Sequence, residues 1–236
     1  MLVPGPNLLR LKQWLYWLAP HGMIRAYEDR RQRLDRANLS APFRLPSQEL
    51  ARLFPGIEGE QVSLSPEQFF RPDSMVLPLP ELLTLMALCG YLRPKQVFEI
   101  GTFTGESTLA MARQLPSDSK IATLDIQKHN GGLAFEGRPE ARQITDLVGD
   151  SRRFDFSPYE SQCDFVFVDA DHSYPCVCND TEIAFRLLKP GGVILRDDYV
   201  FDPRFPECSG VKKALEEMRR PGLFWISGTR FAVFRS

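Results

Sequence analysis

The chain has 236 residues, of which 43% are hydrophobic and 25% charged, and its formal net charge is −1 at pH 7. These values are typical of a globular protein that is long enough to bury a core. The near-neutral charge removes the simplest argument for a nucleic-acid-binding protein, and no stretch reaches the apolar length of a membrane span. The five cysteines are odd in number, which favours buried thiols in a reducing cytoplasm over a disulfide framework.

Residues 1–75 are predicted to form a helical and proline-rich N-terminal extension. The pattern indicates an amphipathic, Trp-bearing helix over 8–19, an Arg-rich helix over 24–39, and a linker or irregular cap over 40–80. The first helix has the composition of one that lies on an anionic membrane surface. Packing against the core or against a second copy of the chain is the commoner fate of such a helix. Membrane contact is therefore not favoured, and homo-oligomerisation stays open.

Residues 76–236 are predicted to form one α/β domain, because strand and helix signals alternate along them. This order favours a doubly wound, mostly parallel sheet with helices on both faces and an antiparallel C-terminal hairpin. The expected strands are 96–100, 120–125, 144–148, 163–169 and 192–197, the expected helices 81–91, 106–114, 178–188 and 210–218, and the hairpin pairs 223–227 with 230–234.

A glycine-bearing turn joins the first of these strands to the helix 106–114. The dinucleotide fingerprint G-x-G-x-x-G, begun at Gly101, would place its other glycines where the chain has Phe103 and Glu106. The second glycine normally lets the backbone approach a pyrophosphate, so the turn favours a ligand without phosphates. Glu99 points the same way, because a carboxylate repels phosphate and suits a cation. The turn therefore predicts a site for S-adenosylmethionine, which carries an ammonium and a sulfonium.

Acidic residues follow the next two predicted strands, at the edge where open α/β sheets bind ligands. Asp125 lies about twenty residues past the glycine turn, where an acid is expected to hydrogen-bond ribose hydroxyls. The alternative is an acid that caps a helix or stabilises a loop. Gly149, Asp150 and Ser151 end the third strand and indicate, more weakly, a contact with adenine.

Three carboxylates are expected to meet at the ends of the fourth and fifth strands. Asp169 ends the fourth strand, and Asp197 and Asp198 end the fifth. Without partners these charges would repel and raise one another's pKa. A hard divalent cation such as Mg²⁺ resolves the repulsion and keeps sites open for substrate oxygens.

The alternative for Asp197 and Asp198 is a structural role. Either acid could cap the following turn, or pair with Arg196 or Arg204.

The glycine turn, the run Val168-Asp-Ala-Asp171 and the run Pro190-Gly-Gly…Asp197-Asp198 together resemble class I S-adenosylmethionine-dependent methyltransferases. The pattern is most similar to the cation-dependent O-methyltransferases of the catechol and caffeoyl-CoA type. The continuation Asp171-His-Ser-Tyr174 is similar to a bacterial branch of sugar and antibiotic O-methyltransferases. The resemblance covers roughly residues 75–236 and implies a seven-stranded Rossmann-like sheet.

The resemblance also implies roles for individual residues toward S-adenosylmethionine. Asp125 would hold the ribose. The methionine end would be held by Glu99, Gly101, Phe103, Gly105 and Ser107, and the adenine would be bordered by Asp150 and Ser151. Thr102, Ile126, Gly149 and Asp169 are further expected cofactor-binding residues.

For the cation and the base, the resemblance places the metal ligands on Asp169, Asp197 and Asp198. The residue three past the first ligand is a lysine base in the catechol and caffeoyl-CoA enzymes, and here it is His172. In the sugar-modifying relatives the proposed base is the acid two past that ligand, which is Asp171 here. His172 is favoured, although it could instead orient the metal-binding acids through a hydrogen bond.

The implied function is transfer of a methyl group from S-adenosylmethionine to a hydroxyl of a small molecule, with the help of Mg²⁺. The acceptor could be a sugar, another natural product or a phenol. Two alternatives stay open: a non-catalytic, cofactor-binding partner subunit, and an oxidoreductase on the same scaffold. Residues 129–137 hold three glycines where relatives have a helix. We expect a loop there that shapes the acceptor pocket.

Overall fold

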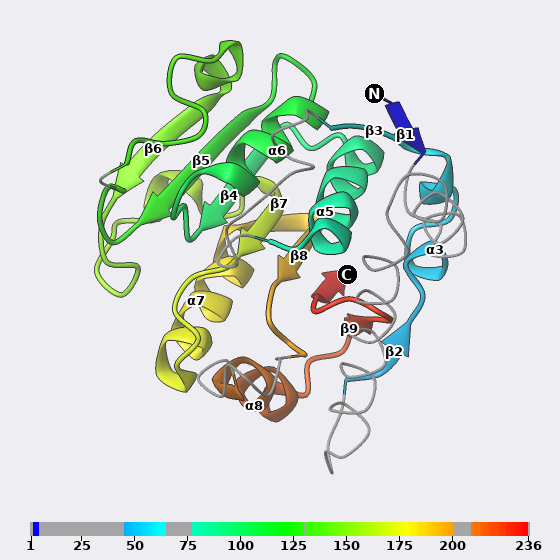
Figure 1. The fold of residues 1–236 in the computed structure, drawn as a ribbon. Coiled ribbons are helices and arrows are strands. Elements are labelled where there is room, and N and C mark those ends of the chain that lie inside the picture. Colours follow the sequence, from blue (N-terminus) through cyan, green and yellow to red (C-terminus); the bar gives the residue numbers. More distant parts are fainter. Residues whose placement is uncertain (1, 5–44, 65–76, 130, 201–208, 236) are drawn as a thin grey trace.

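The computed structural model describes residues 2–4, 45–64, 77–129, 131–200 and 209–235 (Figure 1). The helices expected over 8–19 and 24–39 lie outside these residues, and so does the expected boundary at residue 75. Among the helices that are described, none is long and apolar enough to cross a membrane.

Eight strands of the described chain form the main sheet, in the order β2-β9-β10-β8-β7-β4-β5-β6. β10 is antiparallel to both of its neighbours, and the other neighbouring pairs are parallel. The predicted α/β sheet with its antiparallel hairpin is confirmed, with one strand more than the expected seven. The strands are β2 (Ser47–Gln48), β4 (Gln96–Ile100), β5 (Lys120–Asp125), β6 (Ile144–Val148), β7 (Cys163–Val168), β8 (Leu188–Arg196), β9 (Leu223–Ile226) and β10 (Ala232–Arg235).

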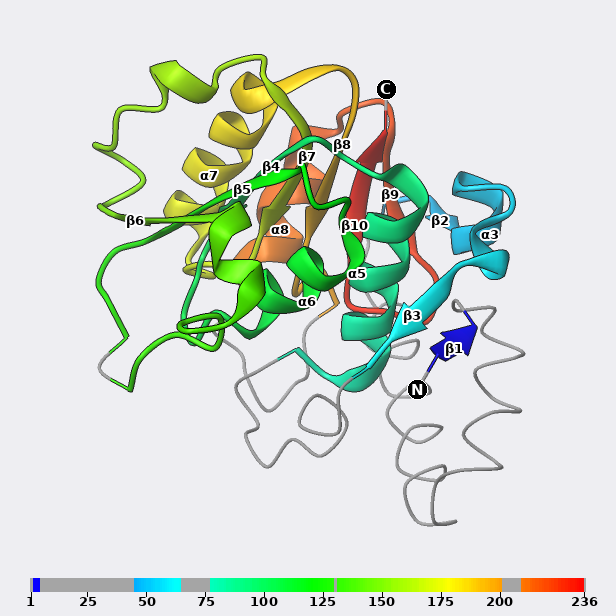
Figure 2. The ribbon, with the colours of Figure 1, turned by 90° about the horizontal axis from the view of Figure 1, so that it is seen from above.

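Helices cover both faces of this sheet. α5 (Leu79–Leu92) and α6 (Glu106–Gln114) lie on one face, and α7 (Tyr174–Leu187) and α8 (Ser209–Met218) lie on the other (Figure 2). Successive side chains of a strand point to opposite faces. On β7, Phe165 and Phe167 accordingly pack into the core under α5 and α6, whereas Val166 and Val168 pack into the core under α7 and α8. Burial on both faces explains why this strand reads as a continuous apolar run.

The described residues that precede α5 form several short elements. β1 (Leu2–Pro4) pairs with β3 (Gln61–Ser63) in a separate antiparallel ribbon, and α3 (Leu50–Leu53) and the 3₁₀ turn η1 (Ile57–Gly59) lie between β2 and β3. The linker or irregular cap expected here thus contains short regular elements. Two further 3₁₀ turns, η2 (Pro139–Gln143) and η3 (Ser157–Tyr159), follow in the main domain.

The parallel strands bring the loops that follow them to one edge of the sheet, and backbone hydrogen bonds join neighbouring loops. The N–H of Gly101 donates to the carbonyl of Leu124 at 2.9 Å, and the N–H of Asp169 donates to the carbonyl of Ile100 at 2.8 Å. The N–H of Asp197 donates to the carbonyl of Val168 at 3.1 Å. The ends of β4, β5, β7 and β8 therefore form one connected edge.

Candidate active site

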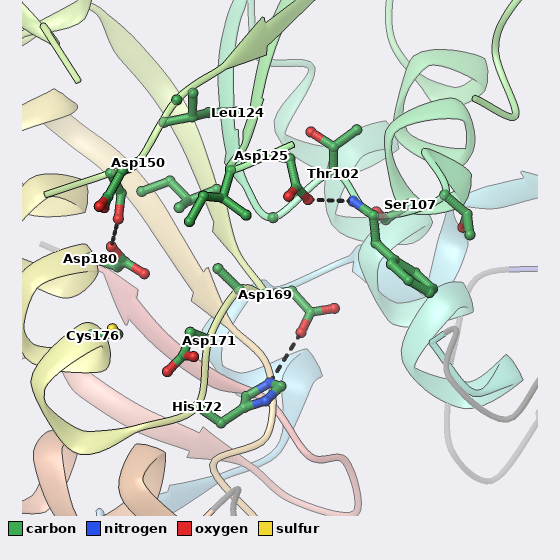
Figure 3. Close-up of a pocket in the computed structure, with 18 of the residues that line it drawn as sticks. Thr102, Ser107, Leu124, Asp125, Asp150, Asp169, Asp171, His172, Cys176 and Asp180 are labelled. Atoms are coloured by element: carbon green, nitrogen blue, oxygen red, sulfur yellow. Dashed lines mark hydrogen bonds and ion pairs between the residues drawn. The ribbon is translucent and has the colours of Figure 1, made fainter. Parts of the chain in front are cut away.

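A cavity of about 460 Å³ opens at this edge of the sheet (Figure 3). Figure 3 shows Asp169 and His172 facing each other in one part of it, with Asp150 and Asp180 in another. The position is the one expected for ligand binding in open α/β sheets. Its lining comprises Leu77, Ile100–Ser107 except Gly105, Leu124–Ile126, Gly149–Arg152, Asp169–His172, Cys176 and Asp180.

Most of the residues predicted for the cofactor are in this lining. They are Gly101, Thr102, Phe103, Ser107, Asp125, Ile126, Gly149, Asp150, Ser151 and Asp169, and both candidate bases, Asp171 and His172, are there too. Glu99, Gly105, Asp197 and Asp198 are not in the lining.

Glu99 is fully buried beneath the turn. Its carboxylate accepts hydrogen bonds from the hydroxyls of Ser107 at 2.6 Å, of Thr123 at 2.6 Å, and of Thr108. Burial raises the pKa of Glu99 to about 7, against the opposing effect of these hydrogen bonds. The carboxyl therefore anchors α6 and β5 under the turn, and its predicted contact with the cofactor stays a prediction.

The turn itself has a backbone that ordinary residues rarely adopt. Gly101 has a φ of +104°, and a Cβ there would lie 2.0 Å from the carbonyl oxygen of Asp169. Phe103 also has a positive φ, of 46°, and its N–H donates a hydrogen bond of 2.7 Å to Asp125 Oδ2. The acid at the end of β5 thus stabilises the turn after β4, in addition to its predicted role toward ribose. Its other oxygen, Oδ1, accepts the N–H of Gln127 at 3.4 Å, and the residue lines the cavity.

The part of the cavity expected to hold adenine is bordered by β5, β6 and α7. Ile126 is 65% exposed, which leaves an apolar surface on the cavity wall. Ser151 donates a hydrogen bond of 2.6 Å to Asp180 Oδ1 on α7, a lining residue that the sequence did not indicate. Hydrogen bonds from Arg152 lower the pKa of Asp150 to about 2, so this acid is charged at neutral pH.

Asp169, His172 and Asp198 form a cluster that could hold a metal ion. Each offers one ligand atom, and these atoms lie within 4.8 Å of one another. His172 Nε2 is 3.0 Å from Asp198 Oδ2 and 3.7 Å from Asp169 Oδ1. Asp169 and His172 are half-buried, and Asp198 is buried. Two of the three predicted metal ligands therefore lie together, with an imidazole beside them.

Asp197, the third predicted ligand, is directed to an arginine instead. Arg230 Nη2 pairs with Asp197 Oδ2, and Arg230 Nη1 lies 2.9 Å from Asp198 Oδ1. The alternative partner Arg196 is buried and donates to the backbone carbonyl of Asp171 at 3.3 Å. Arg204 lies outside the described residues. Sequence reasoning missed Arg230, which stands 33 positions from Asp197 in an ordinary hairpin turn.

Burial and charge have opposite effects on this pair. Burial raises the pKa of Asp197 well above its ordinary value, and the neighbouring Arg230 charge opposes that shift. For Arg230, burial disfavours the charged form, but Asp197 and Asp198 outweigh it and raise the guanidinium pKa. The arginine is charged, and it compensates two of the three converging acids.

The two candidate bases differ in their surroundings. Asp171 Oδ1 accepts a hydrogen bond of 2.7 Å from the N–H of Ser173, and hydrogen bonds from Ser173 lower the pKa of Asp171. A lowered pKa makes the carboxylate a weaker proton acceptor. His172 instead faces Asp169 and Asp198 across the cavity end. Both side chains line the cavity, so position alone does not choose between them.

The loop that was expected to shape the acceptor pocket packs on the cofactor turn. Apart from residue 130, which is not described, residues 129–137 contain no helix, as predicted. The N–H of Ala134 donates to the carbonyl of Thr104 at 2.8 Å. A Cβ on Gly105 would lie only 2.8 Å from the ring of Phe135. None of the described residues from 129 to 137 lines the cavity.

Residues 98–199 match a family described as a methyltransferase domain. The match covers less than half of the chain and shows that this part is similar to such a domain. The match begins on β4 and ends just past Asp198, so it contains both the glycine turn and the acids. Together with the relatives below, it bears out the resemblance of the chain to class I S-adenosylmethionine-dependent O-methyltransferases.

Among characterised relatives, a caffeoyl-CoA O-methyltransferase from Stellaria longipes is 34% identical over 120 residues, which cover 45% of this chain and 46% of that one. A catechol O-methyltransferase from Niastella koreensis is 26% identical over 142 residues, covering 58% of this chain and 63% of the relative. The chain thus spans about half the length of the caffeoyl-CoA relatives that it matches.

Solved structures share the fold over more of the chain. An O-methyltransferase from Bacillus cereus in complex with SAH superposes with a TM-score of 0.56 at 18% identity, covering 96% of this chain and 97% of that one. The O-methyltransferase TomG from Streptomyces achromogenes, in complex with SAM, gives a TM-score of 0.56 at 24% identity, covering 72% and 85%.

Proposed function

We propose that the chain is an enzyme that transfers the methyl group of S-adenosylmethionine to a hydroxyl of a small molecule. The observation that carries the proposal is the cavity that extends from the glycine turn to Asp169 and His172, two members of the cation cluster. One wall has the residues expected around a sulfonium nucleoside, and the other has Asp169 and both candidate bases, Asp171 and His172. The curated relatives carry out O-methylation, as their names state.

The proposed roles follow the lining of the cavity. Asp125 binds the ribose with the carboxylate oxygen capacity that the Phe103 N–H leaves free. Gly101 lets the turn under the methionine end pack on the peptide of Asp169, because a Cβ there would lie 2.0 Å from that carbonyl oxygen. Positioning of donor and acceptor supplies much of the rate enhancement in a transfer of this kind.

Proton removal falls to His172 or Asp171. As the acceptor oxygen forms its bond to the methyl carbon, the bond between that carbon and sulfur breaks. S-adenosylhomocysteine then leaves as a neutral thioether, and the acceptor proton stays on the base. Asp171 is the weaker acceptor, because hydrogen bonds from Ser173 lower its pKa. We therefore assign the base to His172 when no cation is bound at its ring, and to Asp171 when His172 is a cation ligand.

The described residues fit a divalent cation. The cluster offers two carboxylates and an imidazole, and within the described chain the buried Oδ1 of Asp197 accepts no hydrogen bond. When bound at Asp169, His172 and Asp198, a cation would hold the acceptor oxygen and lower the pKa of its hydroxyl. Mg²⁺ with Asp197 as a further ligand stays a prediction, and it requires Arg230 to release that acid.

The test is a methyl-transfer assay with the purified protein. S-adenosylmethionine is supplied with panels of hydroxylated sugars, phenols and other natural products, and S-adenosylhomocysteine is quantified by mass spectrometry. We expect acceptor-dependent release of S-adenosylhomocysteine that Asp169→Asn abolishes. A protein that binds the donor by calorimetry, yet releases no product with any acceptor, would instead be a cofactor-binding subunit. A protein that does not bind the donor contradicts the proposal altogether.

A further inference from the structure

Arg230 reaches the acid cluster from a backbone that is held on both sides. It lies in the turn between β9 and β10. Its N–H donates to Glu81 Oε1 at 3.2 Å, and its carbonyl accepts the N–H of Tyr199 at 2.9 Å. Glu81 and Tyr199 are themselves buried. The backbone of Arg230 is therefore fixed relative to Asp197 and Asp198, which follow the end of β8.

The guanidinium of Arg230 forms ion pairs with one oxygen of each acid, Asp197 Oδ2 and Asp198 Oδ1. Asp197 is only 1% exposed. The other oxygen of Asp198, Oδ2, faces His172 Nε2 at 3.0 Å. A planar guanidinium binds two carboxylates with a fixed spacing of donors, which a lysine does not reproduce.

The donor set that remains is no longer made of carboxylates alone. Mg²⁺ is held through oxygen ligands, usually one or two carboxylates with waters. An imidazole suits first-row transition ions such as Mn²⁺, Fe²⁺, Co²⁺ and Zn²⁺. The positive guanidinium also weakens the attraction of the cluster for every divalent ion, because like charges repel. Beside this guanidinium, the smallest loss of affinity is expected for an ion that binds the imidazole nitrogen of His172 well.

We propose that Arg230 determines the cation specificity of this site. It withholds Asp197, leaves Asp169, His172 and Asp198 as the ligands, and thereby makes the site favour a transition ion such as Mn²⁺ over Mg²⁺. The proposal rests on the proposed function only in assuming that a cation acts at these acids. It concerns which ion binds, and it is tested without donor, acceptor or turnover.

The experiment measures Mn²⁺ binding to the full chain by electron paramagnetic resonance of the free ion, and Mg²⁺ binding by competition against Mn²⁺. The quantity compared is the ratio of the two affinities. Loss of a positive charge alone raises the affinities for both ions by the same factor and leaves their ratio unchanged. A change in the set of ligands alters the ratio. Arg230→Gln frees Asp197, and His172→Gln replaces the nitrogen ligand by an amide oxygen.

We expect the wild type to bind Mn²⁺ at least about tenfold more tightly than Mg²⁺, a step typical of a changed ligand environment. His172→Gln lowers the affinity for Mn²⁺ by about tenfold and has little effect on the affinity for Mg²⁺. Arg230→Gln raises the affinity for Mg²⁺ by a similar factor, which brings the ratio of the Mn²⁺ affinity to the Mg²⁺ affinity closer to one. Arg235→Gln, which removes a charge from the other end of the same hairpin, leaves the ratio at the wild-type value.

Equal ratios in the wild type, Arg230→Gln and His172→Gln would overturn the proposal, as would a wild type that prefers Mg²⁺. If Arg230→Gln does not fold, Arg230→Lys takes its place, because an ammonium keeps the charge but does not bridge both acids. That variant is expected to narrow the ratio as well, and an unchanged ratio again counts against the proposal. Methyl transfer is scored separately, so failure here leaves the proposed function untouched.

Discussion

The backbone N–H of Phe103 donates a hydrogen bond of 2.7 Å to Asp125 Oδ2, and this bond ties the turn after β4 to the end of β5. Phe103 has a φ of 46°, in a region that non-glycine residues seldom occupy. The acid expected to bind ribose is therefore also the acid that supports the strained turn. The predicted binding of the donor and the observed shape of the turn therefore involve the same carboxylate.

Asp125→Ala is expected to weaken S-adenosylmethionine binding by roughly 10- to 100-fold, the range for hydrogen bonds to a charged group. The loss of affinity combines the missing ribose contacts with the missing hydrogen bond to the Phe103 N–H. Calorimetric titration measures the affinity for S-adenosylmethionine. The matched control is Asp118→Ala, just before the start of the same strand, where the acid is exposed and pairs with Lys95. A donor affinity within twofold of wild type in Asp125→Ala would refute the assignment.

Without added divalent cation, His172→Gln is expected to lower kcat by about 10²-fold or more, the usual contribution of a general base. Asp171→Asn is expected to lower it far less, because hydrogen bonds from Ser173 already reduce the basicity of Asp171. The control is Asp155→Asn. That acid accepts the N–H of Ser157 at 3.0 Å in the same local arrangement, away from the cavity lining. The reverse order of effects would move the base to Asp171.

Gly101→Ala is expected to reduce the free energy of unfolding by about 3 kcal/mol, the combined range for a strained φ and an overpacked contact. A Cβ at this position would lie 2.0 Å from the carbonyl of Asp169. Urea denaturation measures the change. Gly59→Ala is the control, because a Cβ there meets nothing within 4 Å, and its effect should stay within about 1 kcal/mol. Similar losses in both variants would mean that crowding at Gly101 is unimportant.

Glu99→Gln is expected to change how stability depends on pH. Burial raises the folded-state pKa of Glu99 from 4.5 to about 7, so the folded state binds more protons than the unfolded state between these values. Wild-type stability therefore falls as pH rises through this window, and the variant escapes that part of the fall. The difference approaches about 3 kcal/mol above pH 7, at roughly 1.4 kcal/mol per pH unit. Parallel stability curves from pH 4.5 to 8 would show that Glu99 keeps an ordinary pKa.

The strands and helices around the cavity could be predicted closely from the sequence, because each strand is a short apolar run that ends at a glycine or an acid. The strands 96–100, 120–125 and 144–148 have the bounds expected for them. β2 could not be predicted in this way. It has two residues, and only its pairing with β9 makes it a strand.

The acids of the site could also be placed from the sequence, because parallel strands end at one edge. Their partners could not. Arg230 reaches Asp197 only because β10 inserts between β8 and β9 and brings its preceding turn to the end of β8. Glu99 reads as a ligand-facing acid, yet hydroxyls on α6 and β5 surround it. Both outcomes depend on side-chain contacts between segments that no local pattern connects.

Gly101 lacks a side chain where the carbonyl of Asp169 fills the space that one would need. The peptide expected under the methyl donor therefore rests on the peptide that carries the first acid of the cation cluster. Because the two peptides are in close contact, we expect binding of the donor and binding of the cation to be linked. By reciprocity, the factor by which the donor changes the affinity for the cation would then equal the factor by which the cation changes the affinity for the donor. Such cooperativity between two different ligands would originate in a single absent methyl group.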